Sequence, residues 1–338
     1  MSELPPPAPI VERSGPLDAE AFAILRKDNQ PVVIRGAFTQ WPAVTAGRQG
    51  AEAIVAYLKG LGSTRPVSAI AAQPDAGGRF FYNEDMSGMN FMRGQGQLEL
   101  FLDDLLRAAE MEAPPSLAVQ SETISEIMPG FTAANRLDLL PQVQPRIWIG
   151  NAIRVAPHYD VKENVAVCVA GRRRFTLFPP EQIANLYPGP FESTPAGTPV
   201  SMVDMAAPDL QAFPRFAEAA KTAQIATLEP GDAIYIPYCW WHGVDSLDPV
   251  SILVNYWWTE NAHAGAGGAY DALLHALFAL RPLPKEQRDI WRTWFDYYVF
   301  ETSGDPSAHL PPQAKGVIGP PSPEQFHKMR QILRQTLG

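Results

Sequence analysis

Residues 231–242 read Gly-Asp-Ala-Ile-Tyr-Ile-Pro-Tyr-Cys-Trp-Trp-His, and this stretch decides the fold. Gly231 and Asp232 are typical of a turn. Residues 233–236 form a run that is too apolar for an exposed strand. Pro237 ends regular pairing, because proline donates no ladder hydrogen bond. The stretch therefore predicts a buried strand, then a break, and then His242 after two tryptophans.

His158, Tyr159 and Asp160 form a second informative stretch. Residues i and i+2 of a β-strand point to the same face, so His158 and Asp160 would share one space while Tyr159 points away. With His242 they would supply two imidazoles and one carboxylate, the facial triad of non-haem Fe(II) oxygenases. His158 and Asp160 alone would also fit a surface ion pair at a strand end. The setting of His242 favours the metal site.

The composition is that of a globular protein. The chain has 338 residues, of which 46% are hydrophobic and 19% are charged, so it can bury a sizeable core. Its formal net charge of −9 argues against nucleic-acid binding through bulk charge. Cys168 and Cys239 each lie in an apolar run, which indicates buried thiols in a reducing compartment.

The N-terminal residues and the hydropathy of the chain bear on its location. The first residues lack the basic and apolar regions of a signal peptide. No window approaches the roughly 18 apolar residues of a membrane span. We therefore expect a cytoplasmic protein without a membrane partner.

The pattern of elements changes twice along the chain. The first third mixes helices (18–26, 51–58, 98–110) with strands (31–36, 67–72, 80–83). The middle third has short strand-like runs separated by glycine and proline, at 117–119, 146–149, 164–170, 174–178, 225–228, 233–236 and 251–258. Many short strands indicate a sandwich or barrel. A small-residue linker at 262–268 precedes helices at 269–280, 285–300 and 323–337.

Residues 231–242 resemble the second cupin motif, Gly-x5-Pro-x-Gly-x2-His, with Cys239 in place of the second glycine. Further matches run in unbroken order through 156–160, Asn164, 171–182, 186–188 and 254–257. Together these motifs resemble the JmjC-type, cupin-like 2-oxoglutarate oxygenases, and among them the asparaginyl hydroxylases. The resemblance is strongest over residues 145–260.

The resemblance implies a mainly β fold with α additions, built on a double-stranded β-helix, or jelly roll. We expect residues 1–115 to form an N-terminal α/β segment that buttresses this core. Residues 116–260 would form the catalytic jelly roll, and residues 261–338 a C-terminal helical region.

The resemblance also implies an activity. His158, Asp160 and His242 match the iron ligands of the family. Fe(II) would be the cofactor, with 2-oxoglutarate and O₂ as co-substrates. The enzyme would be a dioxygenase that hydroxylates a protein side chain or a small molecule, while 2-oxoglutarate becomes succinate and CO₂.

The co-substrate positions depart from the family pattern. The family's lysine for the distal carboxylate falls at Arg173, which can also meet a carboxylate bidentately. A family threonine falls near Val155, and a tyrosine near Ala118, while Gln120 is retained. Two asparagines that the family places near the co-substrate and metal match Asn164 and Asn255.

Other residues are weaker candidates. Phe81, Tyr82, Asn83, Arg93 and Trp257 are possible substrate contacts, although aromatic residues at strand ends are more often core. We expect Glu163 to be solvated or to lie beside a ligand, because its strand parity is wrong for a ligand itself. His263 falls in the predicted linker, where we expect it to be solvated.

An aromatic stripe marks the C-terminal region. It comprises Trp291, Trp294, Phe295, Tyr298 and Val299, which fall on one face of a helix. The stripe could pack on the jelly roll or pair with a second subunit. The resemblance implies dimerisation through C-terminal helices, and so we favour a homodimer.

Two other functions remain open from sequence. The chain could be a non-catalytic cupin-like module that binds a metal or a small acid, as the changes at Val155 and Ala118 would allow. It could also be a metal cupin dioxygenase that does not use 2-oxoglutarate. Asp160 in place of a second histidine counts against that last alternative.

Overall fold

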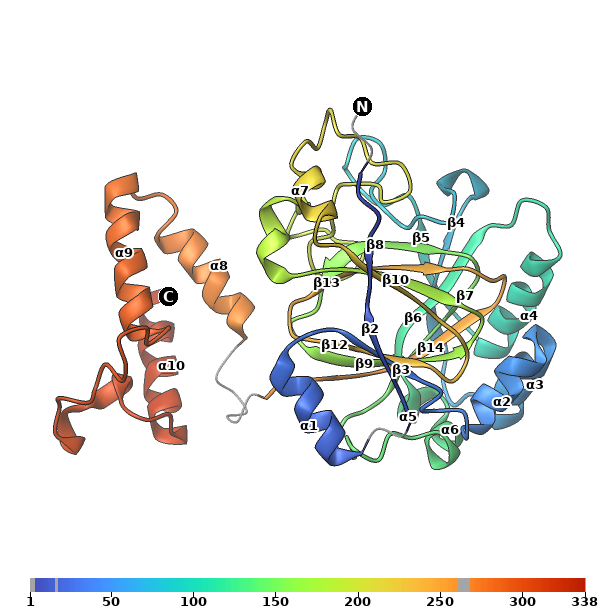
Figure 1. Cartoon of the computed structure of the whole chain (residues 1–338), viewed down its shortest axis with the longest axis horizontal. Helices are drawn as coiled ribbons and strands as arrows, with labels where there is room; N and C mark the ends of the chain where they lie inside the picture. The colour runs from blue at the N-terminus through green and yellow to red at the C-terminus, as the bar shows by residue number, and fades with distance from the viewer. Residues whose placement is uncertain (1–3, 16–17, 261–267, 338) are drawn as a thin grey trace. The chain divides into compact units, whose positions relative to one another are not determined.

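The computed structural model describes residues 4–15, 18–260 and 268–337 (Figure 1). The chain divides into two compact units, Met1–Thr259 and Glu260–Gly338. The predicted linker lies outside the described residues except for Gly268, and His263 lies outside them too. The two units are described separately below.

Two sheets form the framework of the first unit. Within the described residues, the smaller sheet has the strand order β1-β11-β10-β13-β8. Its strands are β1 (Ala8–Pro9), β8 (Arg154–Tyr159), β10 (Arg173–Phe178), β11 (Gln224–Leu228) and β13 (Trp241–Ser246). The larger sheet has the order β2-β3-β12-β9-β14-β7-β6-β4-β5. Its strands are β2 (Val11–Ser14), β3 (Val32–Arg35), β4 (Val67–Ala72), β5 (Met92–Gly96), β6 (Ser116–Thr123), β7 (Arg146–Gly150), β9 (Glu163–Ala170), β12 (Ala233–Ile236) and β14 (Ser251–Trp258).

The strands from β7 to β14 divide equally between the two sheets, which is the arrangement of a jelly roll. The predicted mainly β fold with a jelly-roll core is therefore confirmed. Strands β2 to β6 extend the larger sheet, so the N-terminal part of the chain is continuous with the jelly roll through backbone hydrogen bonds.

Strand alternation separates two hydrophobic layers. On β9, Val165, Val167 and Val169 belong to the core cluster that includes the helices, whereas Ala166 and Cys168 belong to the cluster between the sheets. The helices that supply the first cluster are α2 (Pro42–Gln49), α3 (Ala51–Leu61), α4 (Leu98–Ala109), α5 (Ile124–Ile127) and α6 (Pro129–Ala134). Figure 1 shows α2, α3 and α4 together beside the larger sheet. One face of that sheet is thus closed by helices, and the other faces the smaller sheet.

Most predicted elements agree with the structure to within a few residues, including α1 (Ala19–Asp28), which Asp18 caps. The strand predicted at 80–83 is wrong. The structure has a single bridge there, between Tyr82 and Met89, around a tight turn in which Met86 has a φ of 57°. The pattern misses β5, whose sequence Met-Arg-Gly-Gln-Gly contains two glycines and no apolar alternation. It also misses β13, which Gly243 and a register shift interrupt.

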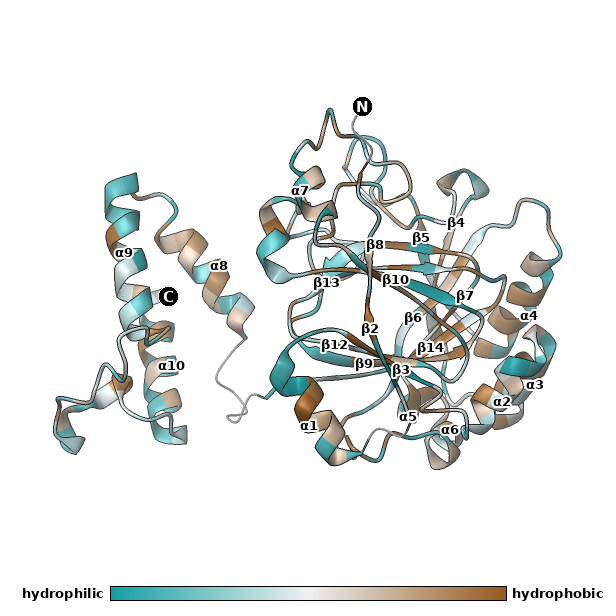
Figure 2. Cartoon of the chain, in the orientation of Figure 1, coloured by the Kyte–Doolittle hydropathy of each residue, from teal (hydrophilic) through white to brown (hydrophobic). Residues whose placement is uncertain are grey.

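The second unit is helical. Its helices are α8 (Ala269–Ala279), α9 (Lys285–Tyr298) and α10 (Pro323–Leu337). Helices α8 and α9 have no buried residue, although Figure 2 shows hydrophobic residues along α8. Phe278 is 74% exposed and Trp294 is 50% exposed. In the part of the chain that the structure describes, no helix is long and apolar enough to cross a bilayer.

Candidate metal centre

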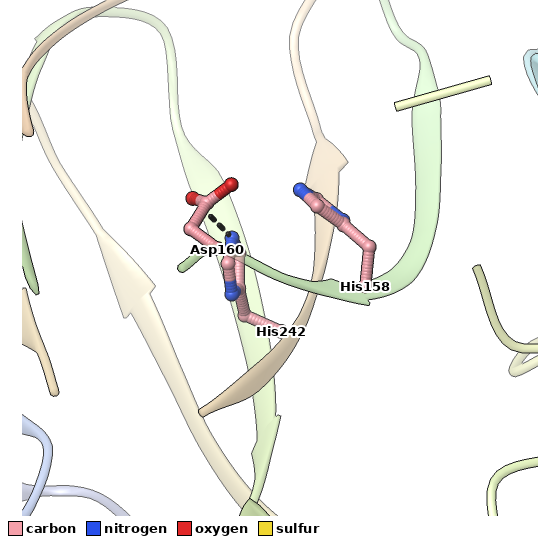
Figure 3. A group of neighbouring side chains, drawn as sticks. All are labelled: His158, Asp160 and His242. Carbon is pink, nitrogen blue, oxygen red and sulfur yellow. Dashed lines mark ion pairs between the residues drawn. The ribbon is translucent and has the colours of Figure 1, made fainter. Parts of the chain in front are cut away.

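Two adjacent strands of the smaller sheet bring the triad together. His158 on β8 and His242 on β13 are direct cross-strand partners, so their side chains share one face. Their ring centroids are 4.3 Å apart. Asp160 follows the last residue of β8 rather than lying within it. One ligand atom from each of the three residues lies within 4.8 Å of the other two, and Figure 3 shows the side chains pointing toward one another.

Backbone carbonyls fix the protonation pattern of both imidazoles. His158 Nδ1 lies 3.0 Å from the carbonyl oxygen of Ala156, and His242 Nδ1 lies 3.0 Å from that of Trp240. A carbonyl oxygen only accepts, so Nδ1 must carry the proton in each ring. Nε2 of each ring is left with a lone pair, as a metal ligand requires.

The charges and lone pairs of the triad favour the binding of a cation. Asp160 Oδ2 lies 3.5 Å from His242 Nε2. It is buried and accepts no hydrogen bond from any described residue. Two imidazole lone pairs and a carboxylate oxygen therefore converge without a donor between them, which is unfavourable unless a positive ion binds there. The residues fit a divalent transition metal, for which this donor set is typical.

Burial keeps His158 neutral. Removal from water, followed by the neighbouring His242, lowers the pKa of His158 to about 4. The ring is therefore uncharged near neutral pH, and its lone pair is available without the loss of a proton.

The turn before His242 is tied to the triad by its backbone. Cys239 has a φ of 59°, in the left-handed region that favours glycine. Its N–H donates to the carbonyl oxygen of Asp160 at 3.1 Å. A positive φ at this position gives a physical reason for the glycine of the cupin motif, and Cys239 adopts it at some cost in strain.

The triad lies in a cavity of about 390 Å³ between the sheets. Of the sequence-predicted residues, those that line it are Val155, His158, Asp160, Asn164, Arg173, Gln120, His242, Asn255, Arg93 and Trp257. A larger cavity of about 540 Å³ lies on the outer face of the smaller sheet, where it is lined by Arg174 and Thr176, and it contains none of the triad. The chemistry therefore belongs to the smaller cavity.

Arg173 is a buried cation that has no carboxylate partner in the described part of the chain. It is 5% exposed. Its Nε donates to Ser251 Oγ at 2.8 Å, and its Nη2 donates to the Ser251 carbonyl oxygen at 3.3 Å. No carboxylate of the described residues forms an ion pair with it, and burial lowers its pKa to about 10. A guanidinium in this position is suited to the carboxylate of a bound small acid.

Neutral amides occupy the wall opposite the triad. Asn255 Nδ2 donates to Asn164 Oδ1 at 3.3 Å, and Trp148 Nε1 donates to Asn255 Oδ1 at 2.9 Å. Ala118 is buried and is not among the residues that line the cavity. The wall thus combines oriented amides with an aromatic surface.

The candidate substrate residues separate into two groups. Arg93 and Trp257 line the cavity, whereas Phe81, Tyr82 and Asn83 do not. Tyr82 packs with Ala156 and Val200, and Asn83 forms a turn through hydrogen bonds with Ser87 and Gly88.

Three features of the site are missed by the sequence reasoning. Ser251 holds Arg173, Trp148 lines the wall, and the loop 194–197 lines the cavity. This loop is anchored nearby, since Thr198 Oγ1 donates to the carbonyl oxygen of Tyr159 at 2.7 Å. Trp148 could have been found by parity, because it faces away from its buried neighbours Ile147 and Ile149. No sequence pattern marks the loop.

Glu163 differs from its expectation. Its carboxylate pairs with Arg26 at 2.7 Å and accepts a hydrogen bond from Tyr235 at 2.8 Å. It is therefore neither solvated nor among the residues that line the cavity. Its contacts instead join α1 to the larger sheet.

Comparison with known proteins gives relatives for part of the chain. It is 37% identical over 115 residues to lysine-specific demethylase JMJ31 of Arabidopsis thaliana, a match that covers 34% of this chain and 20% of that protein. It is 39% identical over 115 residues to human HSPB1-associated protein 1, covering 33% and 22%. It is 35% identical over 151 residues to Jumonji C domain-containing protein 5 of Drosophila melanogaster, covering 44% and 36%. The matches thus span about a fifth to a third of these relatives.

Among solved structures, the X-ray structure of E. coli ycfD is similar with a TM-score of 0.42 and 16% identity, over 95% of this chain and 68% of that one. The family model described as the cupin-like domain matches residues 18–264, which is most of the chain and includes the whole triad. The chain therefore belongs to the JmjC-type cupin-like family.

Proposed function

We propose that this protein is an Fe(II)- and 2-oxoglutarate-dependent oxygenase. The observation that carries the proposal is the cavity itself. It contains a triad whose donor atoms can bind a cation, and a buried arginine that can bind an anion. His158, Asp160 and His242 would hold the metal, and Arg173 would bind the distal carboxylate of 2-oxoglutarate. When bound, the iron and 2-oxoglutarate supply the activation of O₂, with succinate and CO₂ as products.

The chain's own residues would orient these groups and exclude water. The carbonyl contacts of Ala156 and Trp240 hold the two imidazoles in one tautomer. Ser251 fixes the guanidinium of Arg173 before any ligand arrives, so less conformational freedom is lost on binding. Apolar residues such as Phe175 and Leu253 line the same cavity and lower its polarity.

The substrate would be a protein side chain or a small molecule that is hydroxylated. The names of two relatives refer to lysine demethylation and to a protein partner. They support a polypeptide substrate as the first class to test. They do not select the residue, because the matched region is a small part of each relative.

A two-step binding experiment tests the proposal. Mn(II) should raise the Tm of the purified protein, and N-oxalylglycine, an inert 2-oxoglutarate mimic, should raise it further only when metal is present. With Fe(II), O₂ and 2-oxoglutarate, succinate should form slowly without a substrate. A metal-induced rise in Tm with no response to N-oxalylglycine would favour the non-catalytic or metal-cupin alternatives. The proposal fails if neither ligand changes Tm.

We also propose that the C-terminal helices form a homodimer. Large apolar side chains on α8 and α9 are exposed, and they include Leu274, Phe278, Ile290, Trp294 and Tyr298. An apolar surface of this kind is typical of an interface. Light scattering should give twice the chain mass for the wild type and the monomer mass for Trp294→Asp. A monomeric wild type would contradict the proposal, and Arg330→Gln on α10 is a matched surface control.

A further inference from the structure

Outside the triad, two groups that line the cavity and lack partners are hydrogen-bond donors. The side chain of Arg93, on the edge strand β5, lines the cavity and lies 5.2 Å from the Phe91 ring centroid, and it forms no ion pair or hydrogen bond with any described residue. Trp257 Nε1 is buried and has no hydrogen-bond partner in the described chain. Lys162 is exposed and is not among the lining residues, but its Nζ lies 5.3 Å from the Trp257 ring centroid, and it has no carboxylate partner among the described residues. These groups would be satisfied by a ligand that carries hydrogen-bond acceptors.

The charges of the cavity point the same way. Of the described residues that line it, Asp160 is the only carboxylate. Under the proposed function, the positive charges of a divalent metal and Arg173 equal the negative charges of Asp160 and a 2-oxoglutarate dianion, so these four groups together are neutral. The positive charges of Arg93 and nearby Lys162 then remain uncompensated. A substrate brought into this space meets a net positive potential, which focuses anions and repels cations.

We propose that the enzyme oxidises an anionic substrate, whose acidic group is bound by Arg93 and Lys162 while Trp257 Nε1 donates to an acceptor on it. This inference rests on the proposed function and adds the substrate class. The required chemistry is a carboxylate or a similar anion beside the carbon that is oxidised. An acidic peptide and a free small acid both supply it. A methylated lysine side chain, which is cationic, does not.

Binding to the protein loaded with Mn(II) and N-oxalylglycine tests the inference without turnover. The probes are a fluorescent peptide with glutamates around a central asparagine, the same peptide with lysines in place of glutamates, a trimethyl-lysine peptide, and N-acetylaspartate. The Tm rise from Mn(II) and N-oxalylglycine is measured first. Its absence would refute the proposed function, whereas its presence leaves the substrate class to be decided by the probes.

We expect at least one anionic probe to bind about tenfold or more tightly than both cationic peptides. Arg93→Gln and Lys162→Gln should each weaken that binding about three- to tenfold, and the affinity of the wild type should fall as salt is raised. Arg107→Gln, an exposed arginine on α4, is the matched control and should have no effect. Tight binding of the acidic peptide alone would identify a polypeptide substrate, and tight binding of N-acetylaspartate alone a small acid.

Two results would overturn the inference. One is equal or tighter binding of a cationic peptide. The other is a preference for anionic probes that neither Arg93→Gln nor Lys162→Gln weakens, or no such preference at all. Both side chains would then be solvated cations that do not contact the substrate. The two variants are tested separately. If one of them misfolds, the binding measured with the other variant still tests the inference.

Discussion

The arginines on the inward and outward sides of the smaller sheet differ in burial and in their partners. Residues 172–174 are three consecutive arginines. Arg172 and Arg174 are exposed and pair with Asp248 and Asp245, at 2.8 Å and 2.7 Å. Arg173 points between the sheets, is buried, and has no carboxylate partner among the residues that the structure describes.

The difference separates charges that stabilise the surface from charges kept for a ligand. Burial of an unpaired cation opposes folding, whereas a surface ion pair has little effect on it. The inward face carries further groups of this kind, since His158 and His242 also present unsatisfied lone pairs there. The inward face is therefore arranged for binding at some expense in stability, and the outward face is not.

The largest effect should come from the inward histidine. His242→Ala removes one of three ligands, so we expect metal affinity to fall about 100-fold or more. The measurement is the Tm rise with Mn(II), which should be lost at concentrations that saturate the wild type. His327→Ala, on α10 of the other unit, should keep the full rise. A full rise in His242→Ala would place the metal elsewhere.

Arg173→Met should separate stability from binding. Loss of the guanidinium should weaken N-oxalylglycine binding by about 3 kcal/mol, or roughly 100-fold, in the Mn(II)-loaded protein. The Tm of the ligand-free protein should rise, because a buried unpaired charge is replaced by an apolar side chain. Arg173→Lys should recover part of the affinity. Unchanged affinity in Arg173→Met would remove Arg173 from the co-substrate site.

Ser251→Ala should give a smaller effect of the same kind. Without the hydroxyl, Arg173 Nε loses its 2.8 Å partner and the guanidinium is less well positioned. One hydrogen bond to a charged group corresponds to about 1.5 kcal/mol, or roughly tenfold in N-oxalylglycine affinity. Isothermal titration calorimetry would measure it, with Ser125→Ala as a surface control. An affinity equal to that of the wild type would show that the backbone carbonyl alone is sufficient.

The outward arginines should give the smallest effect. Arg172→Gln should lower the free energy of unfolding at pH 7 only slightly, because the ion pair is exposed to water. The hydrogen bond from Arg172 lowers the pKa of Asp248, so the stabilisation by the pair is present above the unfolded pKa near 3.8 and is lost as pH falls through the folded value. Urea unfolding should therefore show the difference between variant and wild type at pH 7 and none once the pH is well below the folded pKa of Asp248. A difference that persists in acid would implicate packing instead of charge.

The convergence of the triad could be predicted because it depends on short-range rules. Strand parity places His158 and Asp160 together, and the motif ending at His242 supplies the third group. The partner of Arg173 could not be predicted, since Ser251 reaches it from the other sheet and only the packing of the two sheets decides that contact. A strand was wrongly predicted at 80–83 because the aromatic residues of this segment have high strand propensity. The tight turn at Met86 limits the pairing there to a single bridge.

The hydrogen bond from the Cys239 amide to the Asp160 carbonyl has a consequence for folding kinetics. It joins segments whose intervening chain forms β9 to β12, so it can form only after a long loop has closed. The complete triad should therefore form late in folding. Metal should act late, slowing the unfolding of the finished protein far more than it speeds its refolding.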